Sequence, residues 1–163
     1  THIMKECEIK TTMRVYGWDE LTNEQQELIN IAKEQTGRAY CPYSHYHVGA
    51  ALLLENGVVV RGCNQENAAY PSGLCAERSA LFSAGAQYPE QPILRLAIAC
   101  YNNGRFTPKP GSPCGACRQV MIETEHRYGK PMEVLLYGEE ETYIFSCAAD
   151  LLPLIFVSES LNG

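Results

Sequence analysis

The sequence predicts an α/β fold with three layers, an α/β/α sandwich in which a mixed five-stranded sheet lies between helices. Three observations predict this class. Helical and strand-like segments alternate along the chain, which favours a sheet covered by helices. Two pairs of strand-like segments are joined by links too short for a crossover, so each pair should be antiparallel. Segment 93–101 carries apolar residues at both odd and even positions, as a strand buried on both faces does.

The first elements follow from a helix cap and a hairpin turn. Thr22 and Gln25 match a capping box, which predicts a helix that runs to about residue 39. Segments 46–55 and 58–63 should be strands, because Asn56-Gly57 between them is a strong signal for a two-residue hairpin.

The later elements are bounded by proline and glycine. Pro113 suits the start of a helix and Gly129 suits its end. The expected elements are a helix over 75–86, a strand over 93–101, a helix over 113–128, strands over 132–137 and 141–145, and a short helix near 147–152.

Residues 1–20 show no clear period and are expected to form an irregular arm, and residues 21–163 should form one domain without an internal linker. The apolar runs are too short to span a bilayer and no signal peptide is evident, so a cytoplasmic location is expected. The net charge is −6 with Lys and Arg scattered, whereas proteins that bind polynucleotides usually carry a basic stripe. The partner is therefore expected to be a small molecule rather than a nucleic acid or a membrane.

Three of the eight cysteines have metal-ligand spacing. Cys114 and Cys117 lie three residues apart in the first turn of an expected helix, and Cys75 opens another helix. A helix N-terminus stabilises thiolates. Three thiolates leave one position open on Zn²⁺, which is typical of a hydrolytic site.

Two charged residues follow Cys75 and favour chemistry over a purely structural role. Glu77 is close to the metal ligands in sequence but is not one of them, as in zinc deaminases with a ligand-x-Glu and Pro-Cys-x-x-Cys signature. Arg78 is expected to draw charge from the sulfur atoms, since three thiolates and a hydroxide give the zinc complex a formal charge of −2.

The main alternative is a closed structural site with Cys63 or Cys100 as a fourth ligand, although such a site needs no Glu77. His45 and His47 are further candidate ligands, but a loop position and a strand position explain them equally well. The remaining cysteines are expected to be small apolar or surface residues.

Taken together, the motifs resemble the small cytidine deaminases of the homotetrameric, three-cysteine type. The resemblance runs from about residue 39 to 161, most of the chain, and its order and spacing are highly specific. It is carried by segments 39–44, 48–52, 61–70, 75–82, 113–120 and 151–153, followed by Phe156.

The resemblance implies hydrolysis of cytidine, and of deoxycytidine, to uridine and ammonia, a reaction of pyrimidine salvage. It implies one Zn²⁺ per subunit on Cys75, Cys114 and Cys117, with zinc-bound hydroxide attacking C4 and Glu77 as the proton shuttle. The other implied roles are ribose binding by Asn64 and Glu66, base contacts by the Ala76 N–H and the Tyr46 ring, a contact of the leaving amine with the Ser112 carbonyl, and insertion of Phe156 into a neighbouring subunit's pocket.

Four features bear on the substrate and the assembly. Tyr46 stands where the family usually has phenylalanine, so its hydroxyl group needs a partner. Phe156 is equally compatible with an ordinary core position. The 1–20 arm, the 102–110 loop and the 71–74 segment depart from the family pattern. The alternatives are a deaminase for another cytosine nucleoside, such as a nucleoside antibiotic, a polynucleotide deaminase, and a zinc-stabilised binding protein without activity.

Overall fold

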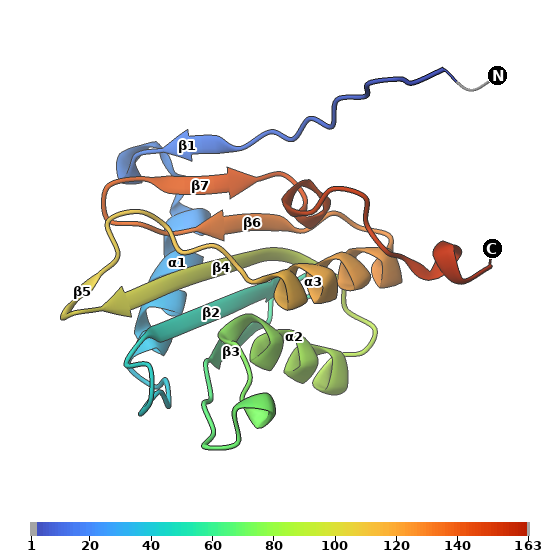
Figure 1. The fold of residues 1–163 in the computed structure, drawn as a ribbon. Helices are drawn as coiled ribbons and strands as arrows, with labels where there is room; N and C mark the ends of the chain where they lie inside the picture. Colours follow the sequence, from blue (N-terminus) through green and yellow to red (C-terminus); the bar gives the residue numbers. More distant parts are fainter. Residues whose placement is uncertain (1–2, 163) are drawn as a thin grey trace.

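The computed structural model describes residues 3–162, in which seven strands form one mixed sheet in the order β1-β7-β6-β4-β2-β3, with β5 paired to β4 (Figure 1). The strands are β1 (Arg14–Tyr16), β2 (His47–Leu54), β3 (Val59–Cys63), β4 (Ile93–Asn102), β5 (Arg105–Phe106), β6 (Glu133–Leu136) and β7 (Thr142–Phe145). The helices are α1 (Asn23–Thr36), α2 (Ala76–Gln87) and α3 (Gly115–Tyr128), with short 3-10 turns at Trp18–Glu20, Tyr70–Ser72, Ala148–Leu151 and Ser158–Asn162.

The predicted α/β class, the three layers and the mixed sheet are confirmed. β2 pairs with β3 and β6 with β7 in the antiparallel sense expected from their short links, while β4 and β6 are parallel. The expected number of five strands was too low, because β1 and β5 arise in segments predicted to be irregular. Both are short, with three and two residues, and form by pairing with β7 and β4 rather than by their own periodicity.

Helix α1 covers one face of the sheet, and α2 and α3 lie side by side on the other (Figure 1). Two buried clusters correspond to these two faces. The alternation along β4 divides its side chains between them: Leu96 and Ile98 pack toward α2 and α3, and Ala97 and Ala99 toward α1. The prediction of a strand buried on both faces is therefore confirmed.

Two glycines allow helices to approach the sheet closely. A Cβ atom on Gly49 would lie 2.0 Å from the Ala32 carbonyl oxygen of α1. A Cβ atom on Gly62 would lie 2.7 Å from both the carbonyl oxygen of Ala76 and the nitrogen of Ala80 in α2. The absence of a side chain at Gly62 therefore determines how near the first turn of α2 lies to the sheet.

Helix α1 begins as predicted, because Thr22 and Gln25 exchange the two hydrogen bonds of a capping box, of 3.0 and 3.1 Å. It ends at Thr36 rather than near residue 39, and the short helix expected near 147–152 is a 3-10 turn over Ala148–Leu151. Within the described residues, no helix is both long and apolar enough to cross a membrane.

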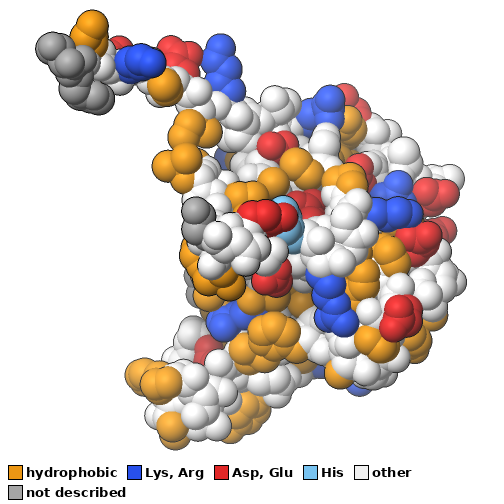
Figure 2. Space-filling view, turned by 90° about the vertical axis from the view of Figure 1, so that its right-hand side faces the viewer, with side chains coloured by type: hydrophobic (Ala, Val, Ile, Leu, Met, Phe, Trp, Pro, Cys, Tyr) orange, Lys and Arg blue, Asp and Glu red, His pale blue; other side chains and the backbone are white. Residues whose placement is uncertain are grey.

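The N-terminal segment is only partly irregular. Residues 3–13 contain no helix or strand and project from the body of the protein (Figure 2), with Thr11 donating a hydrogen bond of 2.6 Å to the Asp150 carbonyl oxygen. Residues 14–16 then join the sheet as β1, followed by the turn at Trp18–Glu20. The expectation of an irregular arm over 1–20 was thus wrong for 14–20, and residues 1–2 lie outside the described range.

Candidate active site

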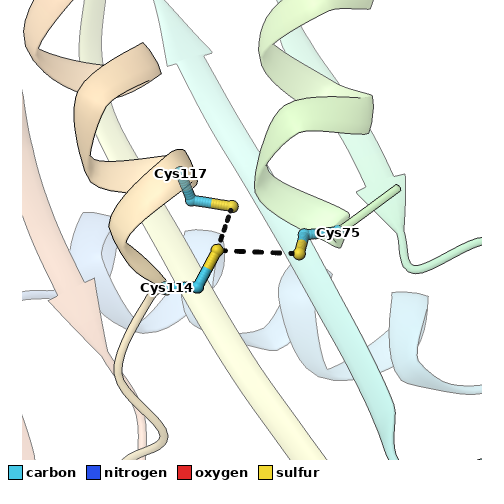
Figure 3. Close-up of side chains that lie close together, drawn as sticks. All are labelled: Cys75, Cys114 and Cys117. Carbon is cyan, nitrogen blue, oxygen red and sulfur yellow. Dashed lines mark hydrogen bonds between the residues drawn. The ribbon is translucent and has the colours of Figure 1, made fainter. Parts of the chain in front are cut away.

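Cys75, Cys114 and Cys117 converge at the start of the two neighbouring helices α2 and α3 (Figure 3). Their sulfur atoms all lie within 4.8 Å of one another, with 3.9 Å between Cys75 and Cys114 and 3.5 Å between Cys114 and Cys117. Cys75 and Cys114 are the N-cap residues of α2 and α3, and Cys117 is in the first turn of α3. The sequence prediction that these three thiols share one site is confirmed.

The donor set fits a zinc ion. Tetrahedral zinc with Zn–S bonds near 2.3 Å places its sulfur ligands about 3.8 Å apart, close to the observed separations. No other protein sulfur completes the set in residues 3–162, because Cys63 contacts the Arg38 carbonyl oxygen and Cys100 lies against Tyr46. A closed four-cysteine structural site is therefore not formed, and the arrangement keeps a position open.

Local electrostatics favour thiolates at this site. Neither Cys75 nor Cys114 caps its helix through a side-chain hydrogen bond, so the first-turn N–H groups keep their partial positive charge for the site. A hydrogen bond from the Cys117 thiol, aided by Arg78, lowers the pKa of Cys75 to about 5. The hydrogen bond with Cys75, and burial after it, raise the pKa of Cys117. A divalent cation bound by the three groups would favour their thiolate forms.

Glu77 is a buried carboxyl group beside the three thiols, with 4% of its surface exposed. Burial raises the pKa of this group above its ordinary value, although a hydrogen bond with Cys117 opposes the shift. Because α2 begins at Ala76, Glu77 occupies the first helical turn and belongs to the same compact region as Cys75. A buried carboxyl group with a raised pKa is suited to proton transfer near neutral pH.

Arg78 lies beside the sulfur of Cys75, with 3.6 Å between its Nη2 atom and Cys75 Sγ. The contact with Cys75 raises the pKa of the guanidinium group, which stays charged in any case. Arg78 thus places a positive charge beside the cysteine cluster.

Glu77 and two of the thiols open into a cavity of about 390 Å³ that reaches from the cysteines to the loop after β3. The part of the lining that comes from the two helix starts contains Cys75, Cys114 and Ala76. The part that comes from the loop after β3 contains Asn64 and Glu66. A second cavity of about 540 Å³ shares Ser44, Asn64, Glu66 and Cys75 with the first. Tyr43 and Tyr70 also line it, with their rings packed edge to face at 5.9 Å.

Glu66 is held in place by the segment before β2. Its carboxylate accepts hydrogen bonds from the Tyr43 and Ser44 nitrogens, at 3.0 and 3.1 Å, and a short one from the Ser44 hydroxyl group. The Ser44 hydroxyl, more than any other contact, lowers the pKa of Glu66, so this group is a fixed anion. It can accept hydrogen bonds from hydroxyl groups and repels phosphate.

Asn64 joins the same part of the cavity lining to β2. Its Oδ1 atom accepts a hydrogen bond of 2.9 Å from the Val48 nitrogen, and its Nδ2 atom donates one of 2.8 Å to the Tyr46 carbonyl oxygen. One amide hydrogen and one lone pair remain for a ligand. Asn64 is therefore both a structural link and a candidate ligand contact.

The other predicted positions differ in their relation to the cavity. Tyr46 and Ser112 line it. Phe156 lines neither of the two cavities and is 57% exposed on its own chain. His47 is on the α1 side of the sheet, with its ring nitrogen 3.3 Å from the Thr36 carbonyl oxygen, and neither it nor His45 joins the cysteine cluster.

Three further residues help to form the cavity and were not predicted from the sequence. Ser44 orients Glu66, and Cys100 and Gly111 form part of the wall beside Tyr46. In the sequence, Ser44 stands out only as part of segment 39–44, and Cys100 only as a possible fourth zinc ligand or a small apolar or surface residue. Pairing of β2 with β4, which sets Val48 opposite Cys100, was the information required to find it.

An α/β/α sandwich with three cysteines and a buried glutamate at two helix N-termini is the architecture of a zinc-dependent hydrolase. Comparison with known proteins specifies the class. Residues 22–128 match the family model described as the cytidine and deoxycytidylate deaminase zinc-binding region. A cytidine deaminase of Halalkalibacterium halodurans is 42% identical over 139 residues, which are 85% of this chain and 98% of that protein.

Two further comparisons agree. A probable cytidine deaminase of Dictyostelium discoideum is 34% identical over 138 residues, covering 85% of this chain and 87% of the relative. The crystal structure of a cytidine deaminase from Burkholderia pseudomallei superimposes with a TM-score of 0.68 at 45% identity, covering 83% of this chain and all of that one. The chain therefore belongs to the cytidine and deoxycytidylate deaminase family, and the resemblance found in the sequence is confirmed.

Proposed function

We propose that this protein is a zinc-dependent cytidine deaminase, which converts cytidine and deoxycytidine to uridine and deoxyuridine with release of ammonia. The observation that carries the proposal is the shared cavity, which is lined by buried Glu77 and two of the thiols and also by Asn64 and Glu66. The names of the relatives agree with this reaction.

Cys75, Cys114 and Cys117 would hold the zinc ion through their thiolates. When bound, zinc supplies Lewis-acid activation of water, whose pKa falls from about 15.7 to about 7 on coordination. Arg78 and the two helix N-termini offset the charge of the three thiolates, which would otherwise weaken that activation.

Glu77 moves protons between the attacking water and the substrate. Its carboxylate accepts a proton from the water whose oxygen bonds to C4, and then delivers it to the ring nitrogen N3. Glu77 next carries the second proton of that oxygen to the exocyclic amine, so that the C4–N bond breaks, ammonia leaves and C4 keeps the oxygen as a carbonyl group. The burial that raises the pKa of Glu77 suits both directions of transfer.

Asn64 and Glu66 are assigned to the sugar hydroxyl groups, and the free N–H of Ala76 to the carbonyl oxygen of the base. A fixed carboxylate such as Glu66 favours a neutral nucleoside over a nucleotide. The net charge of −6 and the scattered Lys and Arg side chains on the face in Figure 2 agree with a small substrate rather than a polynucleotide.

The proposal includes a homotetramer in which Phe156 reaches the site of a neighbouring subunit. Phe156 and Leu154 are 57% and 90% exposed, and two further exposed side chains, Tyr43 and Tyr70, line the larger cavity beside the site. Large exposed apolar side chains near an open cavity are typical of an interface.

The direct test is an ultraviolet assay of the purified protein with cytidine, deoxycytidine, cytosine and blasticidin S, together with a measurement of bound zinc. We expect turnover of the first two, with Glu77→Gln losing about 10²- to 10⁴-fold in kcat while it keeps its zinc. Glu123→Gln, at an exposed position of α3, is the matched control and should be fully active.

Two outcomes would contradict these assignments. Retained turnover in Glu77→Gln would remove its role as proton shuttle, and turnover of blasticidin S without turnover of cytidine would change the substrate. Light scattering tests the assembly separately: a fully active monomer would contradict the role given to Phe156, whereas a tetramer that Phe156→Ala leaves intact but less active would support it.

A further inference from the structure

The hydroxyl group of Tyr46 is at the inner wall of the active-site cavity, where Cys100 of β4 and Gly111 of the following loop meet. A Cβ atom on Gly111 would lie 2.6 Å from the Cys100 sulfur and 3.1 Å from the Tyr46 hydroxyl oxygen. Both polar atoms therefore pack against the same bare backbone position. Cys100 is 4% exposed, so its thiol is enclosed by this contact.

The Cys100 thiol is the polar side-chain group that meets the Tyr46 hydroxyl group beside Gly111. A buried phenol that lacks a hydrogen-bond partner is costly, and a thiol can act as a weak donor or acceptor. Burial foremost, and the hydrogen bond with Cys100 next, raise the pKa of Tyr46, so the hydroxyl group stays protonated. Burial raises the pKa of the Cys100 thiol, so this group also stays protonated. The Tyr46 hydroxyl group therefore faces Cys100 and Gly111 in the wall of the cavity.

The main-chain end of Tyr46 is held as well. Its carbonyl oxygen accepts a hydrogen bond of 2.8 Å from Asn64 Nδ2, and its nitrogen donates one of 3.1 Å to the Ser44 hydroxyl oxygen. Ser44 and Asn64 line the part of the cavity assigned to the sugar. Tyr46 is consequently fixed at both ends, and its ring spans the distance between the sugar-binding residues and the inner wall.

We propose that Cys100 and Gly111 are positioning residues for nucleoside deamination, which act by holding the Tyr46 ring at a set place in the base-binding cavity. The proposal rests on the proposed function. Cys100 supplies the contact for the hydroxyl group, and Gly111 leaves the space in which the two polar atoms meet. Neither residue takes part in the chemistry, so their effect is on binding of the base rather than on the chemical step.

The geometry predicts a specific pattern of suppression. Gly111→Ala places a methyl group 2.6 Å from the Cys100 sulfur, well inside contact distance, and so displaces the thiol and the Tyr46 ring. Cys100→Ala removes the sulfur, after which the nearest remaining atoms to that methyl group are the Tyr46 oxygen at 3.1 Å and the residue-100 Cβ at 3.6 Å. The double variant should therefore bind the nucleoside better than Gly111→Ala alone.

The experiment measures kcat and KM for cytidine, bound zinc and thermal unfolding in the wild type and in Gly111→Ala, Cys100→Ala, Tyr46→Phe and the double variants. We expect Gly111→Ala to raise KM about tenfold with a much smaller change in kcat, and Cys100→Ala to reverse most of that rise. Tyr46→Phe and Cys100→Ala should be non-additive, since each removes the same contact. Gly85→Ala, distant in sequence and facing only the Arg127 side chain at 3.4 Å, is the control.

Additive or worse behaviour of Cys100→Ala with Gly111→Ala would overturn the proposal, as would a loss of thermal stability without any change in KM. Calorimetric titration with uridine gives the same ranking without turnover. Uridine affinities that follow the predicted ranking of the wild type and the variants, together with no deamination of cytidine by the wild type, would contradict the proposed function. They would leave the positioning role supported.

Discussion

Gly62 of β3 is the point at which the active-site helix α2 rests on the sheet, and Gly62→Ala tests whether that approach controls catalysis. The added Cβ would lie 2.7 Å from backbone atoms of Ala76 and Ala80, whereas ordinary contacts begin near 3.4 Å. The helix must then move by roughly 0.7 Å, because backbone atoms cannot turn aside as a side chain can. Ala76 lies between Cys75 and Glu77, so the ligand and the carboxylate move with it.

Two effects follow in magnitude. Overpacking of this kind costs about 1–3 kcal/mol, which for a chain of this size lowers the melting temperature by about 2–12 °C. A misplacement of about 1 Å at a reacting group costs about 10²-fold, so we expect kcat/KM to fall by about 10- to 100-fold. Bound zinc should remain measurable, since the three thiols keep their chemistry.

The assay compares Gly62→Ala with Gly85→Ala. Gly85 lies within α2, and a Cβ atom added there would meet only the Arg127 side chain at 3.4 Å. Gly85→Ala should keep full activity and equal or higher stability, because alanine favours helix over glycine. A Gly62→Ala variant with wild-type kcat/KM would refute the reasoning that close packing at Gly62 sets the position of Glu77. So would an equal loss of activity in Gly85→Ala.

Three other predictions concern the metal, the sugar end and pH. Chelation of the metal should abolish activity, lower the melting temperature and expose Cys75, Cys114 and Cys117 to alkylation, which mass spectrometry detects. Zinc at about 100 times its Kd should restore about 2.7 kcal/mol of stability. Unchanged alkylation would exclude these three residues as ligands. Asn64→Ala leaves the Val48 N–H and the Tyr46 carbonyl unpaired, at a cost of about 1–3 kcal/mol, and should raise KM for cytidine far more than for cytosine; equal effects on both substrates would remove its sugar-binding role. Burial raises the pKa of Tyr46, so its contribution to stability is complete below about pH 10 and is lost as pH rises through the folded pKa. In urea unfolding, Tyr46→Phe should therefore lose stability less steeply than the wild type above about pH 10. Identical pH slopes for the two proteins would contradict this.

The fold could be predicted where local chemistry is strong. The capping box of Thr22 and Gln25, the Asn56-Gly57 hairpin and the Gly129 stop, with φ of +63°, each appear where the sequence placed them. The two short strands β1 and β5 could not be predicted, because three and two residues show no period and become strands only when β7 and β4 provide hydrogen-bond partners. The end of α1 at Thr36 could not be predicted either, since helix propensity alone does not stop the helix there.

For the site, the sequence by itself determined the reactive groups: three cysteines at two helix starts, and Glu77 two residues after the first. Their spacing within each helix is a local property, so it could be recognised without coordinates. Only the tertiary structure decided how the two helices meet, which brings Cys75 within 3.9 Å of Cys114 across 39 positions of sequence. It also decided the partner of the Tyr46 hydroxyl group, because Cys100 reaches that position through pairing of β2 with β4, and long-range strand register is not written in either segment alone.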